Sequence, residues 1–376
     1  MSLYLDYNAS APILPEVLDV MIEAYKSAPG NADSRTHIYG ANAAKLVQNS
    51  RETIASVLGV DQSEVIFTSG STESNNTCIL GIEEYAAKTG KRHIISTAIE
   101  HKAVLEPLKH LEAKGFSIDL VKPDESGRID ADKLLSLIRD DTVLVSVMFV
   151  NSETGIIQPV DTIGKTLKEK GILFHVDATQ ALGKLNDEIR SLDYNMMSIA
   201  SHKIGGPQGI GALILKRDSQ YKRPPISPLM YGGHQERGFR PGTTPIALVA
   251  GFAKAVELCE KNLSANREKC QVLKTSFFKA IKDLPYTVNG DPNYCLPTTV
   301  NISIDGLDAE AAFLCLGNDY SFSNGSACNS SSHSLSYVLE AMGLSEKRKA
   351  EAIRLSWNGN SIIDFTSFVS IIKEMI

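Results

Sequence analysis

Two hydrophobic periods alternate along the first two-thirds of the chain. Short apolar runs that are typical of buried strands occupy residues 64–68, 93–97, 117–121, 142–150, 172–176, 196–200 and 212–215. Segments that are apolar on one side and charged on the other lie between several of these runs. They predict helices at 41–58, 103–114, 131–139 and 160–170, and a further helix after the first run that continues to about residue 88. This alternation predicts an α/β fold with a mostly parallel sheet and helices on both faces.

The last third of the chain has a different pattern. A helical stretch at 246–281 contains few helix breakers and predicts a link between two domains. Strand patterns follow at 299–304 and 352–355, and helical patterns at 309–316, 335–342 and 365–375. We therefore expect a second, smaller α+β domain. Loops rich in Gly, Pro, Ser and Asn are the candidate functional loops, at 30–40, 223–245 and 320–334.

Composition narrows the class of protein. The chain has 376 residues, of which 43% are hydrophobic and 22% charged, as in ordinary globular proteins of about two domains. The formal net charge of −6 gives no reason to expect direct nucleic-acid binding. The first residues show neither the basic nor the apolar region of a signal peptide, and no apolar run approaches the length of a membrane span. We expect a cytoplasmic protein without a membrane partner.

Six cysteines are scattered through the chain. No pair forms a C-x-x-C motif, and no group of Cys and His has zinc-site spacing, so the sequence predicts no metal site. Without a signal peptide they are expected to be reduced thiols. The six are Cys78, Cys259, Cys270, Cys295, Cys315 and Cys328.

A predicted strand at 64–68 runs into Ser and Thr residues and then into a helix. Free N–H groups at a helix N-terminus, beside the hydroxyls of Ser71 and Thr72, form a site suited to a phosphate. The alternative is that one of these hydroxyls only caps the helix, which needs no ligand.

Two further charged residues directly follow apolar strand patterns. Asp177 is costly to bury there unless it meets a cation or a strong donor, and the alternative is a cap of the next helix. Lys203 is a candidate for Schiff-base formation, because desolvation lowers the pKa of a lysine. A phosphate site, a strand-end Asp and a strand-end Lys together are the parts that hold pyridoxal 5'-phosphate (PLP).

Eight segments of the chain resemble the cysteine desulfurases of the class V aminotransferase group, NifS/IscS-like proteins of PLP fold-type I. The resemblance implies a large PLP-binding domain at 15–255 and a small domain at 1–14 and 256–376 that carries a mobile cysteine loop. It also implies a homodimer. The matching segments are 4–9, 68–76, 100–104, 151–155, 175–180, 201–203, 240–243 and 324–328.

The resemblance implies how each matching residue binds PLP. Lys203 would form the Schiff base, Asp177 would keep the ring nitrogen protonated, and His101 would stack on the ring and move protons. Gln180 would bind the phenolic oxygen of PLP. The phosphate would be bound by Ser71, Thr72, Ser201, His202 and, from a second subunit, Thr243.

The resemblance also implies how L-cysteine is converted. Asn151 and Arg354 would hold the substrate carboxylate, for which an Arg fork is suited. Cys328, on a Ser-rich loop, would attack the substrate sulfur as a thiolate and leave L-alanine and a Cys328 persulfide. A protein sulfur acceptor would take this sulfur, and Cys328 would also transiently ligate an iron–sulfur cluster.

Other functions fit the same residues. An aminotransferase or a selenocysteine lyase would use Lys203, Asp177 and His101 equally well. A non-catalytic sulfur-transfer partner is a third alternative, supported only by Ala200, where the family usually has a phosphate-binding Ser. The acceptor pathway stays open among iron–sulfur cluster assembly, tRNA thiolation and DNA phosphorothioation.

Overall fold

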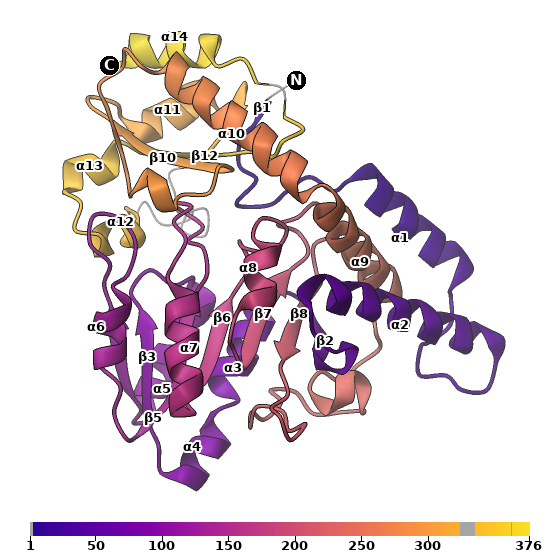
Figure 1. Cartoon of the computed structure of the whole chain (residues 1–376). Coiled ribbons are helices and arrows are strands. Elements are labelled where there is room, and N and C mark those ends of the chain that lie inside the picture. The colour runs from indigo at the N-terminus through magenta and orange to yellow at the C-terminus, as the bar shows by residue number, and fades with distance from the viewer. Residues whose placement is uncertain (1–2, 324–334, 362) are drawn as a thin grey trace.

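A seven-stranded sheet forms the centre of the larger part of the molecule (Figure 1). The computed structural model describes residues 3–323, 335–361 and 363–376. The strand order is β2-β8-β7-β6-β5-β3-β4, and only β8 runs antiparallel to its neighbours, so the predicted mostly parallel sheet is confirmed. The strands are β2 (Val65–Thr68), β3 (His93–Thr97), β4 (Ser117–Val121), β5 (Thr142–Met148), β6 (Leu173–Asp177), β7 (Met196–Ala200) and β8 (Gly211–Leu215).

Helices cover both faces of this sheet, because side chains along each strand point alternately to either side. In β2, Val65 and Phe67 pack in one hydrophobic cluster and Ile66 in another. The first cluster also holds residues of α2, α6, α7, α8 and α9, and the second holds residues of α3, α4 and α5. These helices are α2 (Ile38–Leu58), α3 (Ser71–Leu80), α4 (Glu83–Thr89), α5 (Lys102–Ala113), α6 (Ala131–Ser136), α7 (Val160–Lys170), α8 (Asn186–Ser191) and α9 (Ile246–Lys261).

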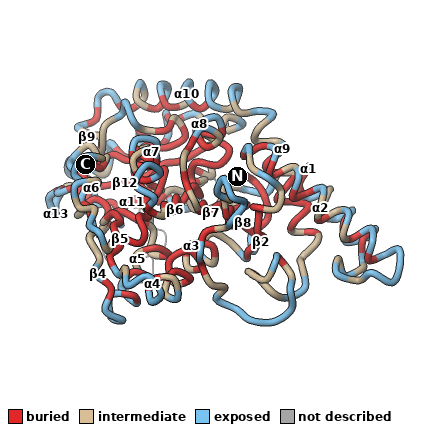
Figure 2. The backbone as a smooth tube through the Cα atoms, turned by 60° about the horizontal axis from the view of Figure 1, so that its bottom comes forward, coloured by how far each residue is buried: buried red, intermediate tan, exposed pale blue. Residues whose placement is uncertain are grey.

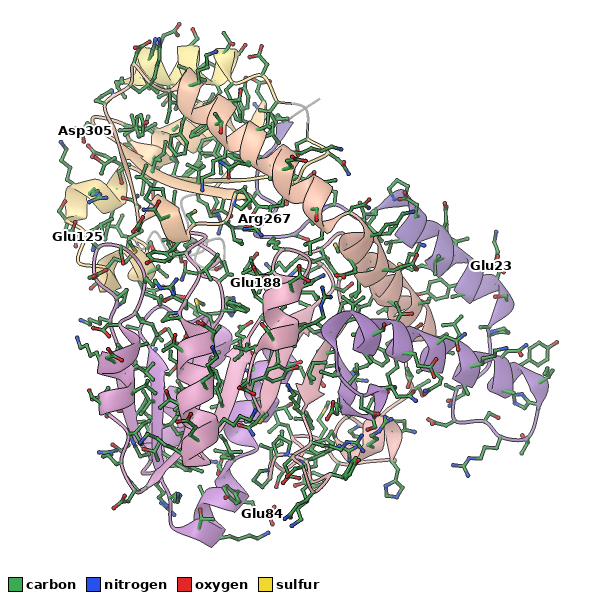
Figure 3. All side chains as sticks on the ribbon, in the orientation of Figure 1. Glu23, Glu84, Glu125, Glu188, Arg267 and Asp305 are labelled. Carbon is green, nitrogen blue, oxygen red and sulfur yellow. The ribbon has the colours of Figure 1, made fainter. Side chains whose placement is uncertain are left out.

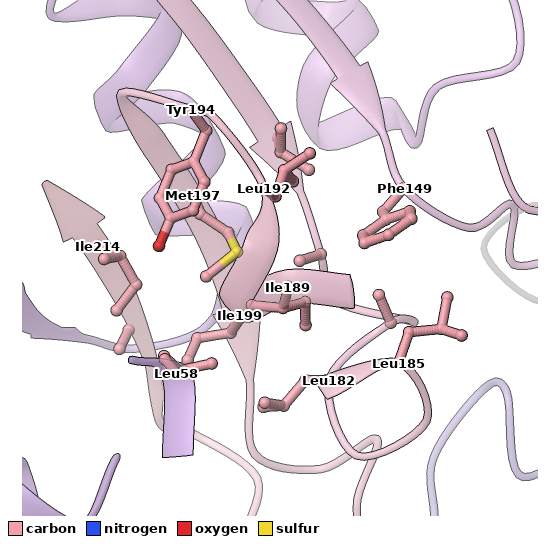
Figure 4. Packing of buried hydrophobic residues seen from close by; sticks show 14 of the residues in the cluster. Leu58, Phe149, Leu182, Leu185, Ile189, Leu192, Tyr194, Met197, Ile199 and Ile214 are labelled. Atoms are coloured by element: carbon pink, nitrogen blue, oxygen red, sulfur yellow. The ribbon is translucent and has the colours of Figure 1, made fainter. Parts of the chain in front are cut away.

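The core consists of aliphatic and aromatic side chains at close contact. Figure 4 shows the part beneath α8, where Met197 and Ile199 of β7 meet Ile189 of α8 and Leu192. Buried residues gather in the strands, whereas exposed residues follow the outer sides of α1 (Pro15–Ser27), α2 and α10 (Leu263–Ala280) (Figure 2). Charged side chains such as Glu23 and Glu84 lie at the periphery (Figure 3).

A second, three-stranded sheet, in the order β12-β10-β9, belongs to the C-terminal part of the chain. It has its own hydrophobic cluster, which includes Phe277, Trp357 and Phe368. The N-terminal strand β1 (Leu3–Tyr4) joins this region by pairing in parallel with β11 (Tyr320–Ser321). The remaining elements are β9 (Tyr286–Val288), β10 (Thr299–Ile304), α11 (Ala309–Leu316), α12 (Tyr337–Ala341), α13 (Glu346–Ala350), β12 (Ala352–Ser356) and α14 (Thr366–Met375), with short 3₁₀ turns η1 (Gln62–Glu64), η2 (Gln235–Gly238) and η3 (Pro292–Tyr294).

Two of the predicted helices are interrupted. The helix expected to reach residue 88 is divided at Gly81, where an added Cβ would lie 2.4 Å from the carbonyl oxygen of Thr77 and 2.6 Å from that of Ser227. The stretch predicted at 246–281 is two helices, α9 and α10, that meet at Asn262. The division into domains at 15–255 and at 1–14 with 256–376 stays a prediction. Within the described residues, no helix is long and apolar enough to cross a membrane.

Candidate active site

A cavity of about 440 Å³ lies at the carboxyl ends of the sheet strands, within the size range of small-molecule sites. Met148 and Asp177 are the last residues of β5 and β6, and most other wall residues lie in the loops and helix starts around this edge. Tyr337 and Arg354 come from the C-terminal part of the chain. Most of the predicted site residues meet in this cavity. Its lining is Asn8, Ala9, Ser71, Thr72, His101, Lys102, Met148, Val150, Ser152, Glu153, Asp177, Thr179, Gln180, His202, Lys203, Tyr337 and Arg354.

Asp177 is a buried carboxylate at the end of β6, with 6% of its surface exposed. Its Oδ2 accepts a hydrogen bond from Asn75 Nδ2 at 2.8 Å, and its Oδ1 accepts one from the Thr179 backbone N–H at 3.0 Å. The next helix, α8, begins only at Asn186, so Asp177 does not cap it. Because burying a carboxylate is costly, this position suits a carboxylate that meets a cationic ligand group.

The first turn of α3 is open to a ligand. Its N-cap residue is Gly70, and no side chain caps the helix, so the alternative that Ser71 or Thr72 only caps α3 is wrong. The ten-residue helix therefore presents its first backbone N–H groups and its positive dipole end beside the cavity residues Ser71 and Thr72. Thr179 also lines the cavity, and its Oγ1 is buried without a hydrogen-bond partner within the described residues.

Lys203 contacts the N-terminal segment of the chain inside the cavity. Its Nζ donates hydrogen bonds to the carbonyl oxygens of Asn8 and Ala9, both at 2.7 Å. Gln180 Nε2 donates to the same Asn8 oxygen at 2.9 Å. Gln180 Oε1 accepts a hydrogen bond from Lys184 Nζ at 2.8 Å, so the fold fixes which end of the Gln180 amide is the donor.

Two histidines complete the part of the wall near Lys203. His101 is the N-cap of α5, and its Nδ1 accepts a hydrogen bond from the Ala103 backbone N–H at 3.0 Å. The neutral His101 ring therefore carries its proton on Nε2. Burial, together with the positive charge of Lys203, lowers the pKa of His202 to about 4. His202 is thus a neutral ring at pH 7.

Arg354 lies on β12 and reaches the cavity with a buried side chain, 2% exposed. Its Nη2 pairs with Asp6 Oδ1 at 2.5 Å, and its Nη1 donates to the Ser152 carbonyl oxygen at 3.1 Å. The Asp6 pairing was not predicted, although Asp6 lies in the recognised segment 4–9. Asp6 and Ser152 hold the guanidinium in place at the cavity wall.

Three predicted residues do not line this cavity. Asn151 uses its amide within the fold, because its Nδ2 donates to the Ile99 carbonyl oxygen at 3.0 Å and its Oδ1 accepts from two backbone N–H groups of the following turn. Ser201 is fully buried behind the wall, and Thr243 is exposed on a loop. The Ser201 hydroxyl would be 2.0 Å from a Cβ added at Gly206, so these two positions are closely packed. Cys328 lies outside the described residues.

Two buried glutamates near the site were not predicted. Burial raises the pKa of Glu153 to about 7 and the pKa of Glu100 to about 8. Glu153 lines the cavity and accepts a hydrogen bond from the Ser336 hydroxyl. Glu100 Oε1 accepts from Thr97 Oγ1 at 2.7 Å and from the Met148 backbone N–H at 2.9 Å, whereas its Oε2 has no partner within the described residues. Both lie in the recognised segments 100–104 and 151–155, which is the only sequence signal for them.

Replacing Glu100 with glutamine should remove a pH-dependent cost of folding. The folded protein keeps a proton on Glu100 up to a pH of about 8, whereas the unfolded chain loses it near the ordinary value of 4.5. Stability therefore falls as the pH rises between these values, by at most ~1.4 kcal/mol per pH unit. Glutamine keeps the oxygen that accepts both hydrogen bonds. The Tm difference between Glu100→Gln and the wild type should grow from pH 5 to pH 8, and an unchanged difference would contradict the burial argument.

The family model described as aminotransferase class-V matches residues 3–356, nearly the whole chain. The chain belongs to the aminotransferase class-V family. The cysteine desulfurase IscS of Cronobacter sakazakii is 37% identical over 382 residues, which cover 100% of this chain and 93% of that protein. The recognised resemblance to cysteine desulfurases is confirmed.

Solved structures support the same relationship. A NifS-like protein superimposes with a TM-score of 0.91 at 34% identity and covers 100% of this chain and 99% of its own. A structure of SspA in complex with cysteine superimposes with a TM-score of 0.84 at 35% identity, covering 96% of this chain and 100% of that chain. The α/β architecture is therefore that of the NifS-like proteins.

Proposed function

We propose that this protein is a PLP-dependent L-cysteine desulfurase. The observation that carries the proposal is the single cavity that combines the Asp177 carboxylate, the Lys203 amine and the uncapped N-terminus of α3. Relatives of similar length are named cysteine desulfurases, and one similar structure was solved with cysteine bound.

The residues of the cavity fit PLP. The open N–H groups of α3 with Thr72 suit its phosphate, and the Asp177 carboxylate suits its protonated ring nitrogen. Thr179 Oγ1, buried without a partner within the described residues, is a polar atom that a bound polar ligand can satisfy. When bound, PLP supplies an electron sink for the bonds of the substrate amino acid.

The remaining cavity residues bind substrate and move protons. Arg354, oriented by Asp6 and Ser152, holds the substrate carboxylate by its guanidinium. His202 acts as a neutral hydrogen-bond donor to the phosphate, because its pKa of about 4 keeps it uncharged. Lys203 Nζ and His101 Nε2 are the groups that carry protons. Asn151 accepts hydrogen bonds from the turn at 152–154 and so positions the wall beside Arg354, and its contact with the substrate carboxylate stays a prediction.

Cys328 is the proposed sulfur acceptor of the enzyme itself. The described residues on both sides of its segment are attached to the cavity wall. Ser323 pairs with Arg354 through backbone hydrogen bonds of 3.1 and 2.6 Å, and the Ser336 hydroxyl donates to Glu153. The described residues that flank the segment with Cys328 thus contact the wall of the substrate site, which supports an attack of its thiolate on the substrate sulfur.

The assay that tests the function uses purified protein reconstituted with PLP and given L-cysteine. We expect L-alanine and protein-bound persulfide in equal amounts before reductant is added. L-selenocysteine and a set of 2-oxo acids are given in parallel. A new amino acid from the oxo acids would indicate an aminotransferase, selenide release without sulfur release would indicate a selenocysteine lyase, and a protein that never binds PLP would indicate a non-catalytic partner.

Asp177→Asn should lower the rate by roughly a hundredfold to a thousandfold, because the negative charge that stabilises the protonated ring is lost. The fold should tolerate the change. The new amide keeps an oxygen toward Thr179 N–H, and Asn75 can turn its amide to accept from it, since Asn75 Oδ1 has no partner within the described residues. Turnover and Tm are measured together, with the exposed Asp132→Asn as the matched control. A native rate in Asp177→Asn would remove its proposed role.

Several features remain parts of the proposal. A homodimer would bring Thr243, on its exposed loop, to the phosphate of the other subunit. The sulfur acceptor is a protein of iron–sulfur assembly, tRNA thiolation or DNA phosphorothioation, and the enzyme works in the cytoplasm. Transfer of labelled sulfur from Cys328 to candidate acceptor proteins would distinguish these pathways.

A further inference from the structure

A second cavity, of about 200 Å³, lies on the other side of the N-terminal segment from the active site. The two cavities share Asn8 and Lys203 as wall residues. The second cavity is formed where the start of α10 and the turn after β12 meet the loops that precede α8 and follow β7. No role in the proposed reaction uses it.

The wall of this second cavity contains lysine side chains but no acidic side chain to pair with them within the described residues. Lys184 and Lys269 both line it, and within the described residues its wall contains no aspartate or glutamate. Glu260, next to the wall residue Cys259, is already paired with Arg190 at 2.9 Å. Burial and the charge of Lys203 lower the pKa of Lys184 to about 8, as expected for a cation without a counter-ion.

The asparagines of this wall add further donors. Asn266 Oδ1 accepts from the Gly359 backbone N–H at 2.6 Å, and Asn358 Oδ1 accepts from the Asn360 backbone N–H at 3.0 Å. Each oxygen is therefore used by the fold, and the amide nitrogen is the end left for a ligand. Two ammonium groups and two amide nitrogens in one cavity are the chemistry that recognises an oxyanion.

We propose that this second cavity binds a small oxyanion, of the carboxylate or phosphate class, between Lys184 and Lys269. The site communicates with the active site through one side chain. Lys184 Nζ donates to Gln180 Oε1 at 2.8 Å, and Gln180 lines the first cavity. An anion that draws Lys184 toward itself weakens this hydrogen bond and so changes the environment of the Gln180 amide.

Binding is tested by titration calorimetry on the PLP-loaded protein, in which the cofactor occupies its own phosphate site. Inorganic phosphate and acetate are the two probes, and chloride at equal ionic strength corrects for screening. We expect one saturable site for at least one probe, and the probe that binds identifies the source of the anion. Lys184→Met and Lys269→Met should each weaken binding about tenfold or more. Lys279→Met, an exposed lysine on the same helix as Lys269, should bind as the wild type does.

Two results would overturn the proposal: no saturable heat with either probe, or equal affinity in the wild type, Lys184→Met and Lys269→Met. The link between the anion site and the active site, through Lys184 and Gln180, is measured separately, and this measurement rests on the proposed function. Saturating anion should shift the absorption spectrum of the bound cofactor in the wild type and in Lys279→Met, and leave it unshifted in Lys184→Met. If an anion binds without shifting the wild-type spectrum, the proposed link from the anion site to Gln180 is wrong. A protein that does not bind PLP would overturn the proposed function, and calorimetry on the wild type, Lys184→Met and Lys269→Met without the cofactor would then still test the anion site.

Discussion

Replacing Lys203 with alanine should abolish covalent attachment of PLP and reduce alanine formation from L-cysteine by about four orders of magnitude. Hydrogen bonds hold the Lys203 amine inside the first cavity, at 2.7 Å from two carbonyl oxygens of the N-terminal segment. Without it, one of these oxygens, that of Asn8, still accepts from Gln180. We therefore expect a folded protein with little change in Tm.

Borohydride reduction followed by peptide mass mapping measures the attachment directly. In the wild type the cofactor mass should remain on the peptide that contains Lys203. Lys222→Ala serves as the matched control, because Lys222 is exposed and does not line the cavity. Attachment of PLP to another lysine in the wild type would show that the assignment of Lys203 is wrong.

Replacing Cys328 with alanine should eliminate the protein-bound persulfide and reduce sulfur release from L-cysteine by at least about a hundredfold. The variant should still bind PLP and L-cysteine, because Arg354, Asp177 and Lys203 are unaffected. The variant therefore distinguishes substrate binding, which it should retain, from sulfur transfer, which it should lose. Mass spectrometry of the protein after one turnover detects the added sulfur, and the spectrum of the bound cofactor reports substrate binding.

The other cysteines provide the control. Cys315 is exposed, and Cys315→Ala should retain both persulfide and turnover. Burial raises the pKa of Cys259 and of Cys270 to about 12 each, so these thiols are poor nucleophiles at neutral pH. If Cys328→Ala formed alanine from L-cysteine at the native rate, sulfur would leave without passing through this thiol, and the proposed mechanism would fail.

Local sequence patterns predict several regular elements at the bounds that the structure shows. The strands β3, β4 and β7 and the helix α7 begin and end at the predicted residues, because their apolar runs are bounded by charged or turn-forming residues. The direction of β8 was not predictable, since an apolar run has the same composition in either orientation. Helix α1 was not predicted, because only two of its residues are buried and several of its apolar side chains, including Leu18 and Tyr25, are exposed.

Some features of the candidate site could likewise be predicted from the sequence, and others could not. Asp177, Lys203 and the start of α3 could be found because each follows a strand in sequence, and parallel strands end at one edge of a sheet. The pairing of Asp6 with Arg354 joins residues from opposite ends of the chain, which no local pattern encodes. The prediction that Asn151 contacts the substrate carboxylate remains untested, since backbone groups of its own turn occupy the amide oxygen in this structure.

The pairing of β1 with β11 has a consequence for synthesis of the protein. Leu3 and Leu5 donate backbone hydrogen bonds to Asp319 and Ser321, at 2.7 and 2.8 Å, and the segment that continues from them supplies both acceptors of Lys203. A ribosome adding about 5–20 residues per second delivers that partner strand tens of seconds after the N-terminus. The first residues to be made are thus among the last to pack, and in a nascent chain that stalls before β11 the Lys203 amine lacks these two backbone acceptors. Cofactor loading should therefore follow release of the chain from the ribosome.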